Sequence, residues 1–235
     1  MDLHAFILDM ERLAPPSLAE EFDAGRIGLV VEGRGEIEHV CCALDATPEV
    51  VRQAALAGAD MLVVHHTPLW TPVTALTGRT ADLMRKILSA DMNLYVMHTN
   101  FDRASGGVND ALSDLLSLQD VIPMTIGNIG TCTISSKELS RRLGGNLRVW
   151  GEKKKIQRLA LVAGSGFDPA IISEAAGLGA DAFLSSEMKH SVARAAQITC
   201  IEATHYALEA PAMQRLGERM DWKYIADPPQ LRHIV

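Results

Sequence analysis

Short apolar runs alternate with segments of helical periodicity along most of the chain. Residues 2–13 carry apolar side chains at helical spacing and are followed by Pro15 and Pro16, which predicts a helix that stops there. Similar patterns predict further helices at 48–57, 80–89, 109–116, 135–144, 169–177, 188–197 and 208–219. The apolar runs between them predict strands at 39–44, 61–64, 93–97, 131–134, 147–150, 158–164, 181–186 and 198–203.

This alternation predicts an α/β fold with mostly parallel sheets flanked by helices on both faces. The pattern occurs twice, so we expect two α/β halves, 1–123 and 124–235, with a soft boundary near Pro123. No low-complexity linker separates them, and we therefore expect the halves to pack together. The tail after Trp222 contains two consecutive prolines and is expected to form at most an edge strand.

Composition places the chain among ordinary globular proteins. It has 235 residues, of which 48% are hydrophobic and 22% charged, which excludes disordered, collagen-like and coiled-coil proteins. The net charge of −7 argues against a nucleic-acid groove or a ring threaded by DNA, because phosphate binding requires a basic surface. The local basic cluster of Lys153, Lys154, Lys155 and Arg158 is interpreted as a solvated turn.

The sequence also predicts where the protein resides. The first residues lack a basic leader and a long apolar run, and no stretch approaches the ~20 apolar residues of a membrane span. The four cysteines show no C-x-x-C spacing and have apolar or β-branched neighbours, so we interpret them as reduced core residues without zinc. A cytoplasmic protein that does not associate with membranes is expected.

Histidines at the ends of predicted strands are the candidates for chemistry. In parallel α/β sheets, ligands bind at the carboxyl ends of the strands. Each histidine alone is more often a polar cap on a strand than a ligand. Three such strand ends, two of them with a carboxylate four residues later, favour metal ligation. These residues are His65 and His66, His98 with Asp102, and His205 with Glu209.

The adjacent pair His65 and His66 needs a special geometry. Neighbouring residues of a regular strand point to opposite faces, but a strand end can leave the pleat. Two imidazoles turned toward one crevice suit two metal ions, with Asp102 or Glu209 as a bridge. Two divalent ions, two carboxylates and a bridging hydroxide would leave a small positive charge, which favours an anionic substrate.

Three further features are weaker signals. Pro211 is tolerated best in a first helical turn, so we expect the last helix to begin near Glu209, with His205 on the loop before it. The glycines at 106–107 and 164–166 precede predicted helices and could seat a phosphate, although an ordinary helix cap is the more common role.

Six segments together resemble a known family. They are ADMLVVHHTPLW (59–70), YVMHTNFDRASGGVNDAL (95–112), GNIGT (127–131), VAGSG (162–166), GADAFLSSEMKHS (179–191) and THYALE (204–209). In this order they resemble the motifs of the GTP cyclohydrolase I type 2 homologues, also called the NGG-interacting-factor-like family. The resemblance covers nearly the whole chain; Thr67 and Leu208 depart from residues common in the family without touching the ligand positions.

The resemblance implies two interlocked α/β domains, a toroidal homohexamer and a site for two metal ions facing the central cavity. The family's ligand positions correspond to His65, His66, Asp102, His205 and Glu209. Two more residues correspond to positions near the site and are candidates to move a proton, His98 and Glu187. Imidazole and carboxylate ligands accept zinc, iron, manganese, cobalt or nickel, so the metal stays open.

Two functions follow from this set. The first is a metal-dependent hydrolase, in which two ions activate a water that attacks a nucleotide or phosphoester. The second is a non-enzymatic ring that binds metal for storage, sensing or the recruitment of partners. The sequence leaves open whether the protein is an enzyme, and a small anionic substrate or nucleotide is expected only under the first.

Overall fold

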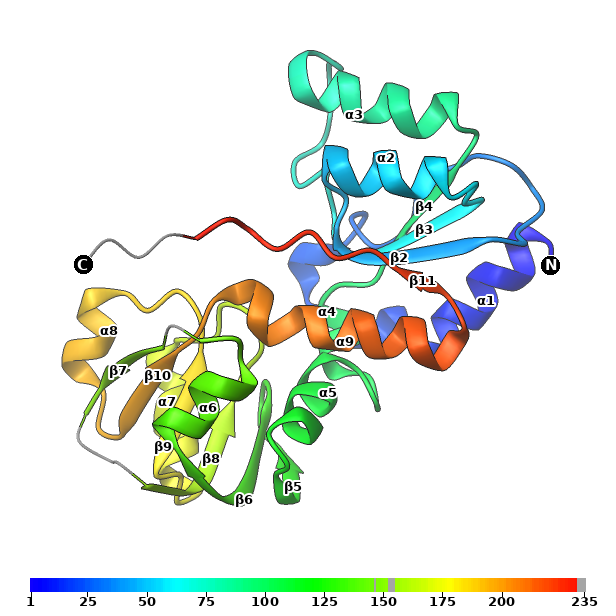
Figure 1. Ribbon diagram of the computed structural model, residues 1–235. Coiled ribbons are helices and arrows are strands. Elements are labelled where there is room, and N and C mark those ends of the chain that lie inside the picture. Colours follow the sequence, from blue (N-terminus) through cyan, green and yellow to red (C-terminus); the bar gives the residue numbers. More distant parts are fainter. Residues whose placement is uncertain (146, 152–154, 232–235) are drawn as a thin grey trace. The chain divides into compact units, whose positions relative to one another are not determined.

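The computed structural model describes residues 1–145, 147–151 and 155–231 (Figure 1). The chain forms two compact units, one of Met1–Ala104 with Met213–Val235 and the other of Ser105–Ala212. Pro123 lies inside the second unit. The division into 1–123 and 124–235 stays a prediction. No described helix is long and apolar enough to cross a membrane.

The first unit is built on a five-stranded sheet with the order β1-β4-β3-β2-β11. Its strands are β1 (Gly28–Val31), β2 (Val40–Asp45), β3 (Met61–His66), β4 (Asn93–Val96) and β11 (Lys223–Tyr224). The helical segments are α1 (Leu3–Leu13), η1 (Pro16–Leu18), η2 (Glu21–Asp23), α2 (Pro48–Leu56), α3 (Gly78–Ser89) and α4 (Thr99–Arg103). Figure 1 shows α2 and α3 on one face of this sheet and α1 on the other. As expected, the tail contributes only an edge strand, β11, which pairs with β2.

Local signals in the sequence place the elements of this unit. Thr47 caps α2 by accepting a hydrogen bond from the Val50 backbone N–H at 3.1 Å, and Pro48 occupies the first helical position. The central strands β3 and β4 are almost completely buried, because helices cover both faces of the sheet. Burial on both faces explains their continuous apolar sequence. It also places the histidines that lie at or just after the carboxyl ends of these strands at one edge of the sheet.

The second unit contains a six-stranded sheet with the order β5-β6-β8-β9-β10-β7. Its strands are β5 (Gln119–Pro123), β6 (Asn128–Ser135), β7 (Arg148–Trp150), β8 (Lys155–Leu161), β9 (Ala182–Ser185) and β10 (Thr199–Glu202). Its helices are α5 (Val108–Leu115), α6 (Ser136–Arg142), α7 (Pro169–Gly177), α8 (His190–Ala195) and the first part of α9 (His205–Met220). Lys155 and Arg158 of the basic cluster lie on β8, whereas Lys153 and Lys154 lie outside the described residues.

The expectation of mostly parallel sheets is wrong, because both sheets are mixed. In the first sheet β1 runs antiparallel to β4, and in the second β5, β6 and β8 form an antiparallel series while β7 runs antiparallel to β10. The sequence analysis missed β1 and β5, which are short edge strands without a long apolar run. Edge strands need no apolar side chains on both faces, so their pattern is weak.

The four cysteines are unbridged. Cys41, Cys42 and Cys200 are buried core residues, as expected, and Cys132 is half-buried. Burial raises the pKa of the Cys42 thiol to about 12 and that of Cys200 to about 11. Both thiols are therefore protonated at neutral pH, a state in which cysteine is a poor nucleophile.

The buried Asp60 carboxylate supports the edge of the first sheet. It accepts hydrogen bonds from the backbone N–H groups of Glu38 and His39, at 2.9 and 2.8 Å, and pairs with the Arg34 guanidinium at 2.8 Å. Burial acts to raise the pKa of this carboxyl, but the two N–H donors and Arg34 outweigh it and hold the pKa below its ordinary value. The stabilisation is therefore complete above about pH 4 and is lost as the pH falls through the lowered pKa.

We expect Asp60→Asn to lower the free energy of unfolding by about 2–3 kcal/mol at pH 7, because charged hydrogen bonds are replaced by neutral ones and one donor loses its acceptor. The loss should shrink as the pH falls below about 4 and through the lowered pKa of the folded parent, where its carboxyl also becomes neutral. Urea unfolding at neutral pH and at roughly one pH unit below the ordinary aspartate pKa measures both values. Asp82→Asn, which alters an exposed pair with Arg85, is the control and should change little.

Candidate metal centre

Two adjacent histidines end strand β3. His65 is fully buried and His66 is half-buried. Both belong to the strand, and His66 lies opposite Asp45 of β2 in the register of the sheet. Their ring centroids are nevertheless only 4.9 Å apart. The structure thus brings the two imidazoles together in spite of their adjacent positions.

His98 joins this pair from the end of the neighbouring strand β4. Its ring centroid lies 5.1 Å from that of His65 and 5.6 Å from that of His66. Each of the three residues offers a ring nitrogen within 4.8 Å of the others. The three histidines, named here the β3–β4 histidine group, could therefore hold a metal ion in common. The resemblance had placed His98 only beside the site.

Oxygen acceptors orient the first two rings. His65 Nδ1 lies 2.8 Å from the Met97 carbonyl oxygen, and His66 Nδ1 lies 2.8 Å from Asp45 Oδ1. Since these oxygens can only accept, Nδ1 carries the proton and donates it. The lone pair then resides on Nε2, which is the nitrogen left for a metal. Such pairs of an oxygen acceptor and a histidine are typical of metal sites.

Asp23 orients His98 in the same way. This aspartate, in η2, is fully buried, and both of its oxygens lie 2.9 Å from His98 Nδ1. It also accepts hydrogen bonds from the backbone N–H of Thr99, at 3.1 Å, and from the Thr99 hydroxyl. Sequence analysis missed both Asp23 and Asp45. Asp45 could have been predicted in the same way as the histidines, because it is a polar residue at the end of a strand. Asp23 could not, because no sequence spacing links it to His98.

Asp102 approaches the β3–β4 histidine group from the short helix α4. Its Oδ1 atom lies 3.6 Å from His65 Nε2, the nitrogen that the Met97 contact leaves for a metal. The first unit therefore places three imidazoles and one carboxylate together. Nitrogen and oxygen donors of this kind suit divalent transition metals.

We expect Asp23→Asn to weaken metal binding by about 10–100-fold, the range found for residues that orient a ligand. An amide offers one acceptor where His98 and Thr99 now share two, so the imidazole loses its fixed orientation. Zinc titration against a chromogenic chelator measures the affinity. Asp9→Asn, at an exposed pair with Arg12, is the control. Equal affinities for parent and Asp23→Asn would contradict this role.

The second unit carries a histidine and a glutamate as candidate ligands at the start of α9. The helix begins at His205, because the Thr204 hydroxyl accepts a hydrogen bond from the Ala207 N–H at 3.2 Å and so caps it. Pro211 lies inside the helix, and the expected start near Glu209 is therefore wrong: the cap outweighs the proline. On one helical face, His205 Nε2 lies 2.9 Å from the buried Glu209 Oε2.

Glu187 orients His205 from the loop after β9. Its Oε1 atom lies 2.9 Å from His205 Nδ1, so Nε2 is again the candidate ligand atom. The Glu187 backbone has a φ of 63°, a left-handed conformation that is uncommon for a residue with a side chain. The contact places Glu187 as a positioning residue for His205.

The glycine loop after β8 packs against this His–Glu pair. Gly164 has a φ of +70°, and a Cβ atom there would lie 2.2 Å from Glu209 Oε1 and 3.3 Å from His205 Nε2. The Gly164 carbonyl accepts hydrogen bonds from the Ser186 N–H and the Ser185 hydroxyl, at 2.9 and 2.8 Å. The VAGSG motif is thus explained by the close approach of the backbone to two candidate ligands.

In each glycine motif considered as a phosphate seat, one backbone amide is already bound within the chain. The Gly106 N–H donates to Asp110 Oδ2 at 2.8 Å, and the Gly166 N–H donates to the Ser185 hydroxyl at 2.8 Å. Both amides are therefore engaged within the second unit. The loops serve the local structure.

Taken together, the donors fit divalent metal. Four histidines have Nδ1 held by an oxygen, which makes Nε2 the candidate ligand atom, and three of the four acceptors are carboxylates: Asp45, Asp23 and Glu187. Two carboxylates, Asp102 and Glu209, face ring Nε2 atoms directly. An arrangement this regular is typical of metal ligation and is not required by ordinary polar caps.

Comparisons with known proteins identify the family of the chain. The family model of Duf34/NIF3 (NGG1p interacting factor 3) matches residues 1–232. A GTP cyclohydrolase 1 type 2 homologue of Clostridium perfringens is 31% identical, over 97% of this chain and 94% of its own. One from Methanothermobacter thermautotrophicus is 34% identical, over 89% and 84%.

Solved structures share the fold. Reduced HcgD from Methanocaldococcus jannaschii matches with a TM-score of 0.81 and 29% identity, over 95% of this chain and 96% of its own. A Bacillus cereus protein related to NIF3 matches with a TM-score of 0.84 over 100% and 99%, at 20% identity, which is a similarity of fold alone.

Proposed function

Because the chain belongs to the Duf34/NIF3 family of GTP cyclohydrolase 1 type 2 homologues, we propose that it is a metal-dependent hydrolase of a nucleotide or another phosphoester. The observation that carries the proposal is the set of four histidines whose Nδ1 atoms are held by oxygen acceptors. The relatives' shared name supports a nucleotide.

The proposed centre holds two divalent ions per chain. The proposed ligands are His65, His66, Asp102, His205 and Glu209. Five protein ligands exceed what one tetrahedral ion accepts and suffice for two ions that share water. Zinc, iron, manganese, cobalt and nickel all accept this donor set.

Bound divalent ions lower the pKa of water toward ~7 and stabilise negative charge that develops on the substrate. The chain's own residues hold and orient the donors. His98, expected from the sequence as a proton carrier, is proposed instead as a further ligand, because buried Asp23 binds its Nδ1 and its ring belongs to the β3–β4 histidine group. Glu187, proposed from the sequence as a second proton carrier, acts here by fixing the His205 tautomer.

Metal analysis and turnover test this proposal on one sample. Protein purified without chelator is analysed for metal, and the metal-loaded protein is assayed with GTP and with p-nitrophenyl phosphate. We expect about two ions per chain and hydrolysis that His65→Ala abolishes. One ion or none would refute the dinuclear centre. Two ions without turnover of any phosphoester would instead support the alternative, a non-enzymatic ring for metal storage, sensing or partner recruitment.

We also propose a homohexameric ring, as the resemblance implies. Strand β5 supports self-association: it lies at the edge of its sheet, and all five of its residues are exposed, including Val121 and Ile122. Exposed edge strands with apolar side chains readily pair with another chain. Light scattering that shows a monomer at micromolar concentration would refute it.

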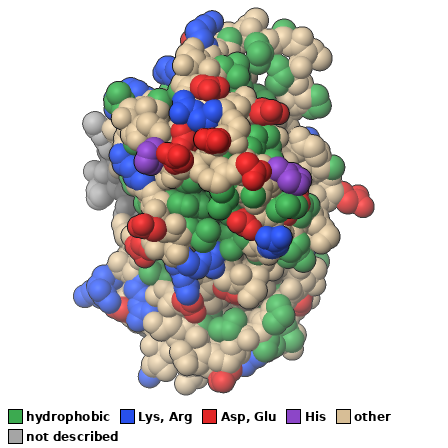
Figure 2. Space-filling view, turned by 90° about the vertical axis from the view of Figure 1, so that its right-hand side faces the viewer, with side chains coloured by type: hydrophobic (Ala, Val, Ile, Leu, Met, Phe, Trp, Pro, Cys, Tyr) green, Lys and Arg blue, Asp and Glu red, His purple; other side chains and the backbone are tan. Residues whose placement is uncertain are grey.

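Nucleic acid is not part of the proposed function. Figure 2 shows Lys and Arg side chains interspersed with acidic and hydrophobic ones on the face in view, rather than gathered in a basic stripe. The net charge of −7 points the same way.

A further inference from the structure

A cavity of about 400 Å³ opens in the first unit, between the segment leading into β1 and the loop after β3. Pockets for small molecules typically enclose ~300–1,000 Å³. One cation, two hydroxyl groups and several apolar side chains line it, and no acidic residue does. Six of the lining residues are Arg26, Ile27, Leu29, Thr67, Leu69 and Thr71.

Arg26 is held in place at this cavity. Its Nε donates a hydrogen bond to the Trp70 carbonyl oxygen at 2.6 Å, and its guanidinium carbon lies 5.2 Å from the centre of the Trp70 ring. Within the described chain the guanidinium makes no ion pair with a carboxylate. An oriented guanidinium without an acidic partner is suited to bind the two oxygens of a phosphate or carboxylate.

The cavity adjoins the β3–β4 histidine group. Thr67 directly follows His66, and the Trp70 ring lies 5.6 Å from that of His98. The centroid of the Phe22 ring lies 6.2 Å from that of His98 and 6.1 Å from that of Trp70. Half of the surface of both Phe22 and Trp70 is exposed, so exposed aromatic surface borders His98.

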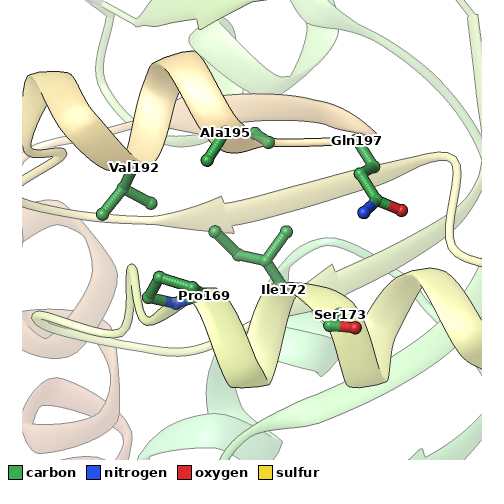
Figure 3. Close-up of a pocket in the computed structure, with 7 residues that line it drawn as sticks. Pro169, Ile172, Ser173, Val192, Ala195 and Gln197 are labelled. Carbon is green, nitrogen blue, oxygen red and sulfur yellow. The ribbon is translucent and has the colours of Figure 1, made fainter.

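A second pocket provides a contrast. It lies in the second unit between α7 and α8, where Figure 3 shows Val192 and Ala195 facing Pro169 and Ile172. No charged residue lines it. Its walls are mainly apolar, whereas the first cavity combines apolar walls with a fixed cation.

We propose that the cavity at Arg26 binds a small organic anion, with its phosphate or carboxylate group on the guanidinium and its apolar or aromatic body against Ile27, Leu29 and Leu69. This inference deepens the proposed function, on which it rests for the role of the cavity as a substrate subsite beside the metal ligands. Binding of the anion itself does not depend on metal. For the proposed hydrolase, this ligand class narrows the substrate to a phosphoester that has an apolar or aromatic body and a phosphate or carboxylate group for Arg26.

Ligand binding to the full chain tests the inference. The protein is stripped of metal with a chelator, checked by circular dichroism, and titrated with phenyl phosphate, benzoate, inorganic phosphate and benzyl alcohol by NMR. We expect an aromatic anion to bind at least about tenfold more tightly than inorganic phosphate or the uncharged alcohol. Whichever of phenyl phosphate and benzoate binds more tightly identifies the head group.

Two variants and a control locate the site. Arg26→Ala should weaken binding of the preferred anion about tenfold or more, and Ala24→Trp, which fills the cavity from an exposed position, should abolish it. Arg85→Ala removes the same charge from α3 outside the cavity and should have no effect. The inference is overturned if neither anion binds, if inorganic phosphate binds as tightly, or if Arg26→Ala retains the parent affinity. The metal content of the untreated protein tests the proposed function separately, because it does not depend on whether an anion binds at Arg26.

Discussion

Replacing Glu209 with glutamine is expected to weaken metal binding by more than about 100-fold while the fold survives. The substitution keeps the size of the side chain but removes a buried negative charge 2.9 Å from His205 Nε2. Loss of a charged ligand should cost more than the ~10–100-fold typical of residues that only orient ligands. Zinc titration by competition with a chelator measures it, with circular dichroism as the folding control.

Two glutamates provide matched comparisons for this result. In Glu187→Gln the amide oxygen can still accept from His205 Nδ1, so the affinity should fall by at most about tenfold. Glu218→Gln changes an exposed residue of the same helix, which accepts a hydrogen bond from Gln214 Nε2 at 3.0 Å, and should behave like the parent. If Glu209→Gln bound two ions as tightly as the parent, Glu209 would not be a ligand.

Replacing Gly164 with alanine is expected to eliminate metal binding by the second unit's His–Glu pair. The added Cβ atom would lie 2.2 Å from Glu209 Oε1, inside any allowed contact distance, so the carboxylate or the loop must move. The positive φ adds strain of about 1 kcal/mol or more. We expect a loss of about 2–3 kcal/mol in stability, on the order found when packed sites are overfilled, together with the loss of metal.

Gly179→Ala separates these two effects. Gly179 has a similar φ of +81°, but a Cβ atom at this position would have its nearest neighbour, Arg158 Cδ, 3.9 Å away. This control should therefore lose about 1 kcal/mol from backbone strain and keep its metal. Calorimetric melting and zinc titration of both variants give the comparison. Normal metal binding in Gly164→Ala would show that the approach of the loop does not shape the ligand pair.

The sequence predicts the elements that carry strong local signals. Thr47 with Pro48, Ser135 with Glu138, and Asp168 with Pro169 each begin a helix where expected. Hydrogen bonds of such caps depend only on neighbouring residues, so the sequence contains all the information. The histidines at the ends of β3 and β4 are predictable for the same reason, because a buried strand followed by a polar residue is a local pattern.

Features that depend on distant residues were not predictable in this way. The orientation of β1 and β5 follows from their pairing partners, β4 and β6, and not from their own sequence. Asp23 reaches His98 across 75 positions of the chain. The helix start at His205 is a different case, because both competing signals are local. The Thr204 cap outweighs Pro211, and the sequence alone did not show which of the two would decide.

During translation the first unit cannot finish folding until the second unit has been made, because its residues come from both sides of the second unit. Its sheet closes with β11, and its core includes the stacking of Trp222 on Phe6 and the contact of Cys42 with the Met213 carbonyl. On the ribosome, the second unit is complete before these residues exist. Strand β2 therefore keeps an open edge until β11 has been made, and an unpaired edge promotes association with other chains. A chain truncated shortly before residue 213 would contain the candidate ligand histidines but lack the last strand of its first sheet.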